Sequence, residues 1–563
     1  MNFLLLLSLF FSSGSQNSWT FQTSLPESPN KLLKFNILLK QQNLDILENE
    51  LVKRSNPFSD TYGQWLTKTE IDNIIKPNDY TPLYDWLNDH GVNIINNTDN
   101  LECSASTTTV QKLFRVELDK NFKAVYALPK NIEPHVDMVL GFANNYSRKS
   151  FGPKNNHFFN NESVITPESI RTLYNISSTS PAKFSSQSVV EFLNDECYNN
   201  DNLQVFLQDN NIPNSSITKN HFWGNCSTDT PDPDIEATLD IQYQTGINNN
   251  SHLYYISVSD WLYQFSNIIY NSTSPPKVIS MSYGWAEWDQ CDPNVFPTCL
   301  INVGSEQYTR RTNTEFIKLG LRGVTLVASS GDAGAPGRMN EQCEGDKMLN
   351  PAFPASSPWV LAVGGTIIMN SSVIKNPKTP LCQNYSCISG GEELNCNYDR
   401  CGWTSGGGFS NYFNRPAWQV KAANAYLDNK NLFPPTKYFN TQGRIYPDIS
   451  LVAHNFLINT PSGYNTVDGT SASAPSMSAM IGILNNMRVS KGLSTLGPVG
   501  PLLYTMQNNC DTCFKDITVG SNNSSEFTNC KWGYSAAKGF DAVYGLGVPN
   551  FDEMYKYVNN INK

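Results

Sequence analysis

The sequence contains few charged residues and no excess of basic ones. Only 16% of its 563 residues are Asp, Glu, Lys or Arg, and the formal net charge is −10. A chain with this balance lacks the cationic surface that binds phosphate backbones, so we expect no nucleic-acid partner. After its first residues the chain also lacks an apolar run long enough to cross a bilayer, and we expect no membrane anchor. Its length allows more than one hydrophobic core.

The N-terminal apolar run is too short for a membrane span. Residues 2–11 are mostly apolar and residues 12–15 are small, a pattern that predicts a secretory signal peptide over residues 1–15. No basic side chain precedes the run, so a buried N-terminal strand is the alternative. Sequons for N-glycosylation favour the secretory route, to a lysosome or out of the cell. They begin at Asn96, Asn175, Asn214, Asn271 and Asn384.

The thirteen cysteines agree with an oxidising compartment. Cys103 stands alone in the first part of the chain, and the other cysteines, an even number, lie between Cys197 and Cys530. A zinc site at Cys510 and Cys513 is the alternative, but no second cysteine pair lies at the spacing of a zinc ribbon. We therefore expect disulfides, whose pairing the spacing leaves open.

The histidines do not supply the base that a serine nucleophile commonly uses. None of the six lies in a His-Gly-Thr-His-like segment of the kind found in subtilisin-type triads. A candidate nucleophile is nevertheless present, because Ser471 lies among small residues in segment 469–475, at a predicted junction of loop and helix. Backbone amides at such a helix start can hold negative charge. The base must then be another type of residue.

Two carboxylates are candidates for this base. Segment 234–243 predicts a helix with apolar residues four positions apart, and Glu236 and Asp240 share another face of it. If both were ionised they would repel, so we expect one of them to hold a proton and to have a raised pKa. Glu236 would then act in acid as the base for Ser471. A solvated helix face is the alternative explanation for such a pair.

A third carboxylate follows a predicted buried strand. Residues 324–327 (Val-Thr-Leu-Val) are typical of such a strand, and the glycine-rich loop after them contains Asp332. This places Asp332 at the carboxyl end of a strand, where sites in α/β sheets form. A protonated Asp332 there could donate a hydrogen bond to an oxyanion. An ordinary tight turn is the alternative.

Together these motifs resemble those of the sedolisin family of serine carboxyl peptidases, most closely its lysosomal tripeptidyl-peptidase branch. The similarity also covers segments 280–284, 353–358, 363–366, 405–410 and 446–448, and thus nearly the whole chain. The resemblance implies that Ser471 is the nucleophile, Glu236 the base, Asp240 its orienting partner and Asp332 the oxyanion carboxyl. Asp468 departs from the family pattern, in which serine is common, and this change bears on pH optimum and substrate preference.

The fold that the resemblance implies is α/β, a subtilisin-like parallel sheet with flanking helices, preceded by an α+β propeptide domain. Strand patterns at 278–281 and 324–327, alternating with helical segments, favour a parallel sheet by themselves. We expect residues 16–160 to form the propeptide domain with a polar C-terminal linker at 144–161. Residues 161–563 would form the peptidase domain.

Local patterns predict several elements of these domains. In the first domain they predict helices at 68–75 and 82–89 and a strand at 110–116. Thr166, followed by proline, predicts the N-cap of a helix near the start of the second domain. Segment 282–284 is a candidate edge for pairing with a substrate backbone. In sedolisins the first domain caps the active site and is removed on acidification, so the resemblance implies an intramolecular inhibitor.

Two acidic residues near the C-terminus lie in carbonyl-rich loops, and calcium prefers such oxygen ligands. By themselves these loops are also compatible with plain turns. They match the calcium loop of sedolisins, and the resemblance implies one calcium ion. Its ligands would be the side chains of Asp516 and Asp541 and the carbonyls of Ile517, Ala537 and Gly539. Ala537 stands where glycine is usual, although only its carbonyl is needed.

The sequence thus predicts an acid-activated serine carboxyl peptidase that is made as a self-processing zymogen and acts on polypeptides. Release of tripeptides from free N-termini is the first hypothesis, and endopeptidase action is the second. A non-catalytic secreted glycoprotein on the same fold is the third, and the intact Glu236, Asp240, Asp332 and Ser471 disfavour it. We expect a monomer, although no feature of the sequence fixes the oligomeric state or the subsite preference.

Overall fold

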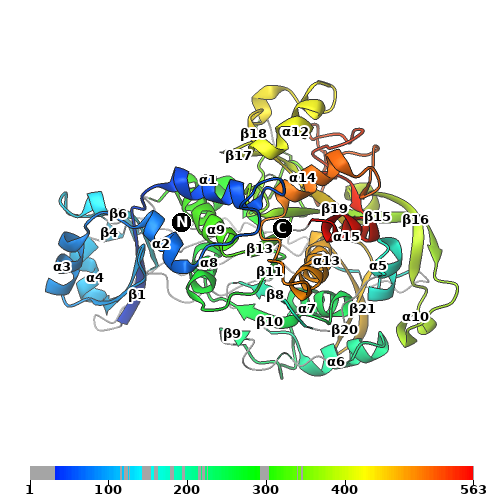
Figure 1. Ribbon diagram of the computed structural model, residues 1–563, viewed down its shortest axis with the longest axis horizontal. Helices are drawn as coiled ribbons and strands as arrows, with labels where there is room; N and C mark the ends of the chain where they lie inside the picture. The colour runs from blue at the N-terminus through cyan, green and yellow to red at the C-terminus, as the bar shows by residue number, and fades with distance from the viewer. Residues whose placement is uncertain are drawn as a thin grey trace, which may run out of the picture.

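The computed structural model describes residues 32–561, apart from 115–116, 119–123, 126, 142–153, 157–162, 178–182, 193–196, 214–216, 218–221, 225, 292–302, 339, 341 and 344–346. The predicted signal peptide and most of the predicted linker lie outside the described residues. A smaller N-terminal domain, in blue, lies beside a larger C-terminal domain that runs from cyan to red (Figure 1). No described helix is both long and apolar enough to cross a membrane.

The N-terminal domain is an antiparallel sheet with strand order β2-β3-β1-β6 and helices packed on it. Its elements are β1 (Leu32–Leu39), α1 (Leu44–Ser55), α2 (Lys68–Ile75), α3 (Thr81–Asp89), β2 (Asn93–Asn96), β3 (Asn100–Ser106), α4 (Thr107–Phe114), β4 (Glu117–Leu118), β5 (Ala124–Val125), η1 (Glu133–His135) and β6 (Val136–Gly141). In β1, Leu33, Phe35 and Ile37 are buried and alternate with more exposed residues, which is typical of a sheet with one buried face. The predicted α+β domain is confirmed.

Both predicted helices of this domain are present as α2 and α3. Helix α2 begins with a capping box, in which the side chains of Thr67 and Glu70 accept hydrogen bonds from each other's backbone N–H groups. The predicted strand at 110–116 is wrong, because residues 107–114 form α4. Apolar side chains three and four residues apart are buried on one side of α4, and this helical spacing outweighs the strand propensity of its β-branched residues.

The C-terminal domain is built on a sheet with strand order β16-β15-β13-β11-β8-β10-β9, in which β19 also pairs with β15. Strand β16 is antiparallel and the others run parallel. The strands are β8 (Ser186–Glu191), β9 (Phe222–Trp223), β10 (His252–Ser257), β11 (Val278–Met281), β13 (Thr325–Ser329), β15 (Leu361–Val373), β16 (Ile388–Asn395) and β19 (Ile449–Val452). The predicted parallel α/β sheet is confirmed, as are its strands near 278–281 and 324–327.

Helices cover both faces of this sheet. Val278 and Val327 belong to the apolar core that includes α7 and α13, whereas Ile279 and Leu326 belong to the core that includes α8 and α9. The helices are α5 (Pro167–Leu173), α6 (Asn200–Asp209), α7 (Ile235–Ile247), α8 (Leu262–Asn271), α9 (Ser305–Leu321), α10 (Pro380–Asn384), α11 (Tyr398–Cys401), α12 (Val420–Leu427), α13 (Thr470–Ser490), α14 (Gly500–Asn509) and α15 (Phe551–Asn559). Thr166 caps α5, as predicted.

Shorter elements lie in the connections between these strands and helices. They are β7 (Lys154–Asn156), β12 (Trp285–Ala286), η3 (Glu287–Asp289), β14 (Ala352–Phe353), β17 (Gly408–Asn414), η4 (Ala417–Gln419), η5 (Thr436–Tyr438), β18 (Gly443–Tyr446), β20 (Phe456–Thr460), β21 (Gly463–Asp468), β22 (Phe514–Lys515) and β23 (Val548–Pro549). Strand β7 lies within the predicted linker. It pairs with the end of β21, directly before the segment that contains Ser471.

Disulfides connect cysteines of the C-terminal domain, as expected. The pairs are Cys197–Cys226, Cys343–Cys530, Cys382–Cys387, Cys396–Cys401 and Cys510–Cys513. The last pair removes the zinc alternative at this position, because a disulfide sulfur is not a thiolate ligand. Cys103 is a buried free thiol in the N-terminal domain.

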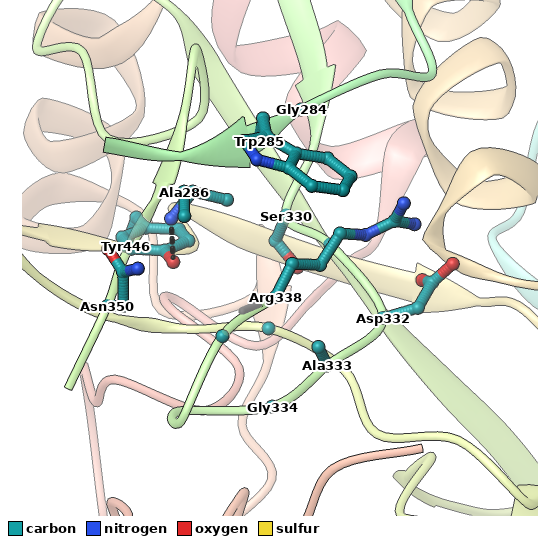
Figure 2. Close-up of a pocket in the computed structure, with 14 residues that line it drawn as sticks. Gly284, Trp285, Ala286, Ser330, Asp332, Ala333, Gly334, Arg338, Asn350 and Tyr446 are labelled. Atoms are coloured by element: carbon teal, nitrogen blue, oxygen red, sulfur yellow. Dashed lines mark hydrogen bonds between the residues drawn. The ribbon is translucent and has the colours of Figure 1, made fainter. Parts of the chain in front are cut away.

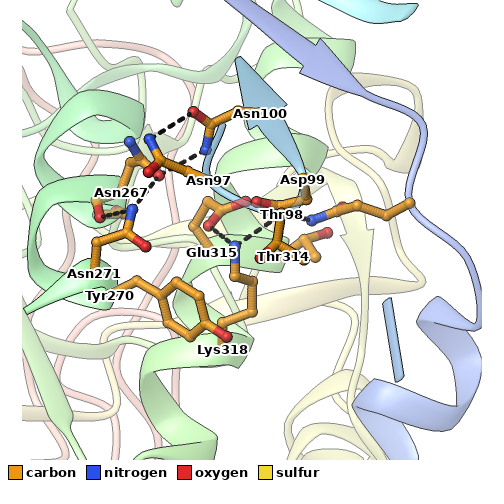
Figure 3. Close-up of polar contacts among 12 residues, drawn as sticks. Asn97, Thr98, Asp99, Asn100, Asn267, Tyr270, Asn271, Thr314, Glu315 and Lys318 are labelled. Atoms are coloured by element: carbon orange, nitrogen blue, oxygen red, sulfur yellow. Dashed lines mark hydrogen bonds and ion pairs between the residues drawn. The ribbon is translucent and has the colours of Figure 1, made fainter. Parts of the chain in front are cut away.

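The N-terminal domain docks on α9 through a buried ionic cluster (Figure 3). Asp99, in the turn between β2 and β3, is 1% exposed, and its Oδ2 lies 2.8 Å from Nζ of Lys318 and 3.2 Å from the Arg311 guanidinium. Glu315 contacts the same two cations, at 2.5 Å and 3.3 Å. The cluster therefore has carboxylates from both domains around two cations of α9.

Uncharged contacts extend this interface on both sides. The side-chain amide of Asn100 donates to Oδ1 of Asn267 on α8 at 2.9 Å (Figure 3). At the other end, Nε1 of Trp65 donates to the Thr495 carbonyl at 2.9 Å. The Trp65 ring packs so closely on Gly497 that a Cβ there would lie 2.4 Å from it. The apolar core of the N-terminal domain is continuous with the core that includes α8 and α9.

Candidate active site

Ser471 is the second residue of α13 and follows a turn that favours glycine. Gly469 has a φ of 136°, and a Cβ at this position would lie 3.2 Å from Oδ2 of Asp332. Ser471 is 6% exposed, and its Oγ donates to the carbonyl of Ser282 at 3.4 Å. The hydroxyl thus lies at the start of a long helix, as predicted, where backbone N–H groups can hold negative charge.

Glu236 and Asp240 lie on α7, whose first turn is capped by the side chain of Asp234. Both carboxyl groups are almost completely buried, with exposures of 1% for Glu236 and 0% for Asp240. The alternative of a solvated helix face is therefore wrong. Helix α7 packs against α13 and the sheet. The Ser282 hydroxyl, which lies 2.8 Å from Asp240, also lies 3.2 Å from the Ser471 carbonyl, so the acidic face points into the protein near the start of α13.

The environment of this pair favours the protonated carboxyl groups. Burial raises the pKa of Glu236 and of Asp240 well above the ordinary range. The charges of Asp240 and Glu191 raise the pKa of Glu236 further, and the Ser471 side chain opposes this rise. Among the described residues, Oε1 of Glu236 has no hydrogen-bond partner. The pair can therefore retain a proton in acid and still present an oxygen that could accept one from a hydroxyl.

Two further residues of this cluster were not predicted as catalytic-site residues. Ser282, considered only as part of a substrate edge, donates from Oγ toward both oxygens of Asp240, at 2.8 Å and 2.7 Å. Glu191 is buried at the end of β8 and accepts a hydrogen bond of 2.5 Å from the hydroxyl of Tyr283. Both lie at the carboxyl ends of buried strands. A polar residue in that position is the signal that could have identified them.

Asp332 lies in the loop after β13 and faces the N-terminus of α13. Its Oδ1 accepts hydrogen bonds from the backbone N–H of Thr470 at 2.8 Å and from the Thr470 hydroxyl at 2.7 Å. Burial raises the pKa of Asp332. The charge of Arg338 lowers this pKa, and the charge of Glu526 raises it. The carboxyl group therefore holds its proton to a higher pH than an exposed aspartic acid does, beside the turn that leads to Ser471.

A small pocket lies beside Asp332 (Figure 2). Segments 284–286 and 330–334, which follow β11 and β13, form two of its walls. The Arg338 guanidinium lies 5.4 Å from the centre of the Trp285 ring, between that ring and the carboxyl group of Asp332. The predicted substrate edge borders this pocket at Gly284.

The two acidic residues predicted to bind calcium lie on loops that meet in the structure. The carboxylate of Asp541 is buried and accepts from the N–H of Ala537 at 2.8 Å, and Asp516 accepts from the N–H of Gly539 at 2.7 Å. Burial raises the pKa of Asp541 to about 7, and the charge of Asp516 adds to the rise. Ile517 follows Asp516 directly. Two carboxylates that repel each other within loop backbone form an oxygen-rich donor set that suits a hard cation.

The chain is similar to known proteins over most of its length. The chain matches the profile of the pro-kumamolisin activation domain over residues 17–145 and that of the subtilase family over residues 234–495. It is similar to physarolisin of Physarum polycephalum, with 34% identity over 94% of each chain. It is 29% identical to tripeptidyl-peptidase 1 of Dictyostelium discoideum, over 92% of this chain and 88% of that protein. For tripeptidyl-peptidase 1 of Homo sapiens the identity is 28%, over 94% of this chain and 92% of that protein.

A solved structure supports the fold. Pseudomonas sedolisin, a serine-carboxyl proteinase complexed with two molecules of pseudo-iodotyrostatin, aligns with 70% of this chain and 98% of its own. The TM-score is 0.50 and the sequence identity is 21%. The C-terminal domain is thus a subtilisin-like domain.

Proposed function

This chain belongs to the sedolisin family of serine carboxyl peptidases, and from that premise we propose that it releases tripeptides from the free N-termini of polypeptides in acid. The observation that carries the proposal is the buried carboxyl pair, Glu236 and Asp240, directed at the helix start that holds Ser471. The similarity to proteins named tripeptidyl-peptidase 1 supports the release of tripeptides. The match to an activation domain makes the N-terminal domain a propeptide.

In the proposed reaction, Glu236 accepts the proton of the Ser471 hydroxyl while Oγ attacks the carbonyl carbon of the scissile bond. Asp240, held by the Ser282 hydroxyl, keeps Glu236 oriented. Protonated Asp332 donates a hydrogen bond to the oxyanion, an interaction whose loss typically costs about 2.7–4 kcal/mol of transition-state stabilisation. Glu236 then gives its proton to the leaving amine. Water hydrolyses the acyl-enzyme by the same proton transfers.

The proposed chemistry is confined to acid by two of these groups. As pH rises through the raised pKa of Asp332, the carboxyl group loses the proton that it would donate to the oxyanion. The Glu236 and Asp240 pair likewise loses its shared proton at higher pH, which leaves two buried charges side by side. A rise in pH would therefore both remove a donor and destabilise the site.

The propeptide domain is the proposed intramolecular inhibitor. Its docking on α9 and the pairing of the linker strand β7 with β21 bring the linker to the segment that leads to Ser471. This placement supports self-processing within one chain, followed by release of the propeptide. We expect the mature enzyme to be a monomer in a lysosome or outside the cell.

One calcium ion is proposed for the C-terminal loops. The side chains of Asp516 and Asp541 would bind it together with the carbonyls of Ile517, Ala537 and Gly539. The ion would neutralise two neighbouring carboxylates and thereby hold the last loops on the domain. Because Asp541 has a pKa of about 7, protons compete with the cation in acid, and binding strengthens as pH rises.

The test compares two peptides at acid pH after self-processing is complete. One is a fluorogenic Ala-Ala-Phe amide with a free N-terminus, and the other is the same compound with a blocked N-terminus. The proposal predicts cleavage of the first and little cleavage of the second. Equal cleavage of both would indicate endopeptidase action. Cleavage of neither peptide, or full activity of the Ser471→Ala variant, would contradict the proposed mechanism.

A further inference from the structure

Asp468, the last residue of β21, is buried beside a histidine. It is 1% exposed, and its Oδ2 lies 2.5 Å from Nδ1 of His454, whose side chain is 16% exposed. The other oxygen, Oδ1, accepts from the backbone N–H of Asn455 at 2.7 Å. Each carboxylate oxygen thus has a partner in the same short segment. A buried carboxylate needs such partners, because burial without them is costly.

This pair links the loop between β19 and β20 to the turn before Ser471. The backbone N–H of Gly469 donates to the Ala453 carbonyl at 3.0 Å, next to the contacts of Asp468 with His454 and Asn455. Segment 453–455 therefore holds two consecutive residues of the turn. Gly469 cannot hold the turn by itself, because its φ of 136° is one of many conformations open to glycine.

The other side of the turn contacts the proposed oxyanion carboxyl. Thr470 donates to Asp332 from its backbone and its hydroxyl, and the Thr470 hydroxyl accepts from the N–H of Gly331 at 3.1 Å. A shift of Asp468 would therefore move Thr470 relative to Asp332. It would also move Ser471, which follows Thr470 directly.

We propose that Asp468 and His454 are a positioning pair for the nucleophile turn, which fixes Ser471 relative to Asp332. This inference rests on the proposed function, because it takes Ser471 and Asp332 as the reacting groups. In the proposed role, neither Asp468 nor His454 contacts the substrate. The pair acts through the backbone of Gly469 and Thr470, and a misplacement of about 1 Å at such a turn can cost 100-fold in rate.

The experiment separates positioning from folding and from substrate binding. Asp468→Asn removes one acceptor while keeping the shape, and His454→Ala removes the donor. We expect each to lower kcat by about 10- to 100-fold with KM changed less than about twofold. His454→Asn keeps a donor near the place of Nδ1 and should restore kcat to within about threefold. The double variant Asp468→Asn/His454→Ala should be no slower than the slower single variant, because both remove one contact.

The matched control is Asp209→Asn. Asp209 accepts a hydrogen bond of 2.8 Å from the hydroxyl of Tyr464, near the start of the same strand, β21. This variant changes a carboxylate contact with the same strand, but away from the nucleophile turn, so its kcat should stay unchanged. The rate of self-processing of the full chain at acid pH is a second readout, because it uses the same serine and requires no added substrate.

A normal kcat in folded Asp468→Asn and His454→Ala, or a change in KM alone, overturns the positioning role. If Asp468→Asn does not fold, the comparison of His454→Ala with His454→Asn decides, and equal loss in both overturns the proposal. Activity of Ser471→Ala would instead overturn the proposed function itself. An inactive Ser471→Ala beside normal Asp468 and His454 variants contradicts only the positioning pair.

Discussion

Replacement of Asp99 by alanine is expected to weaken the docking of the propeptide domain. Asp99 is the carboxylate that this domain places between Lys318 and Arg311 of α9. Loss of one partner from a buried ion pair costs about 3–5 kcal/mol, because the remaining charge stays buried. Glu315 still contacts both cations in the variant. We therefore take the lower value, about 3 kcal/mol, which weakens docking roughly 100-fold.

The pKa of Asp99 determines how this contact depends on pH. Burial alone would raise the pKa of Asp99, but the charges of Lys318 and Arg311 outweigh burial and lower it to about 2. A group with a depressed pKa stabilises the docked state above its unfolded pKa, roughly 3.9, and this stabilisation is lost as pH falls through about 2. Asp99 therefore holds the propeptide in mild acid. Protonation of Asp99 is therefore not the trigger of activation. Because docking is weaker in Asp99→Ala, this variant should self-process at higher pH than the parent chain.

The assay uses the full chain in a Ser471→Ala background, in which self-cleavage is removed. An added protease cleaves the propeptide at a rate that follows the population of the undocked state when reclosing is fast. We expect cleavage to be about 100-fold faster in the Asp99→Ala chain. Glu306→Ala is the control on the same helix, because its pair with Arg310 is exposed and worth only about 0.2–1 kcal/mol. Equal cleavage of the two variants would refute the role of the cluster.

Three further predictions concern the site and the calcium loops. Ser471→Ala should remain a folded precursor of full mass after acid treatment, as judged by electrophoresis and thermal melting. Asp332→Ala should lose about 100- to 1,000-fold in kcat, and Asp332→Asn should retain more activity. The pH profile of Asp332→Asn should extend toward neutrality, because an amide donates a hydrogen bond without titrating. Calcium chelation should lower the melting temperature of the mature enzyme, Asp541→Ala should mimic this, and the effect should grow from acid to neutral pH. A melting temperature that the chelator does not change, together with no calcium found by metal analysis, would exclude the calcium site.

Much of the fold could be predicted because strand and helix patterns were strong where the core is deepest. The runs at 278–281 and 324–327 are apolar and bounded by polar segments, and both form central strands of the sheet. Segment 110–116 shows the opposite case. Its β-branched residues favour a strand, and only packing of one face against the sheet of the N-terminal domain determines that residues 107–114 form a helix.

The site was less predictable, because its contacts join distant parts of the chain. The i, i+4 spacing of Glu236 and Asp240 places them on one helix face, but spacing alone does not distinguish a buried face from a solvated one. The Ser282 hydroxyl reaches Asp240 only because β11 ends beside α7. The burial of Glu191 likewise depends on the order of the strands, which no local pattern contains.

The proposed dependence on acid has one physical cause, the burial of carboxyl groups. Burial is the largest contribution to the raised pKa of Glu236, of Asp240 and of Asp332. Asp99 is buried as deeply, yet its pKa falls because two cations surround it. We therefore expect the same protein to keep one set of carboxyl groups protonated for chemistry and one carboxylate ionised for docking. The neighbouring charge, and not burial alone, decides whether a buried acid of this chain serves proton transfer or holds the propeptide.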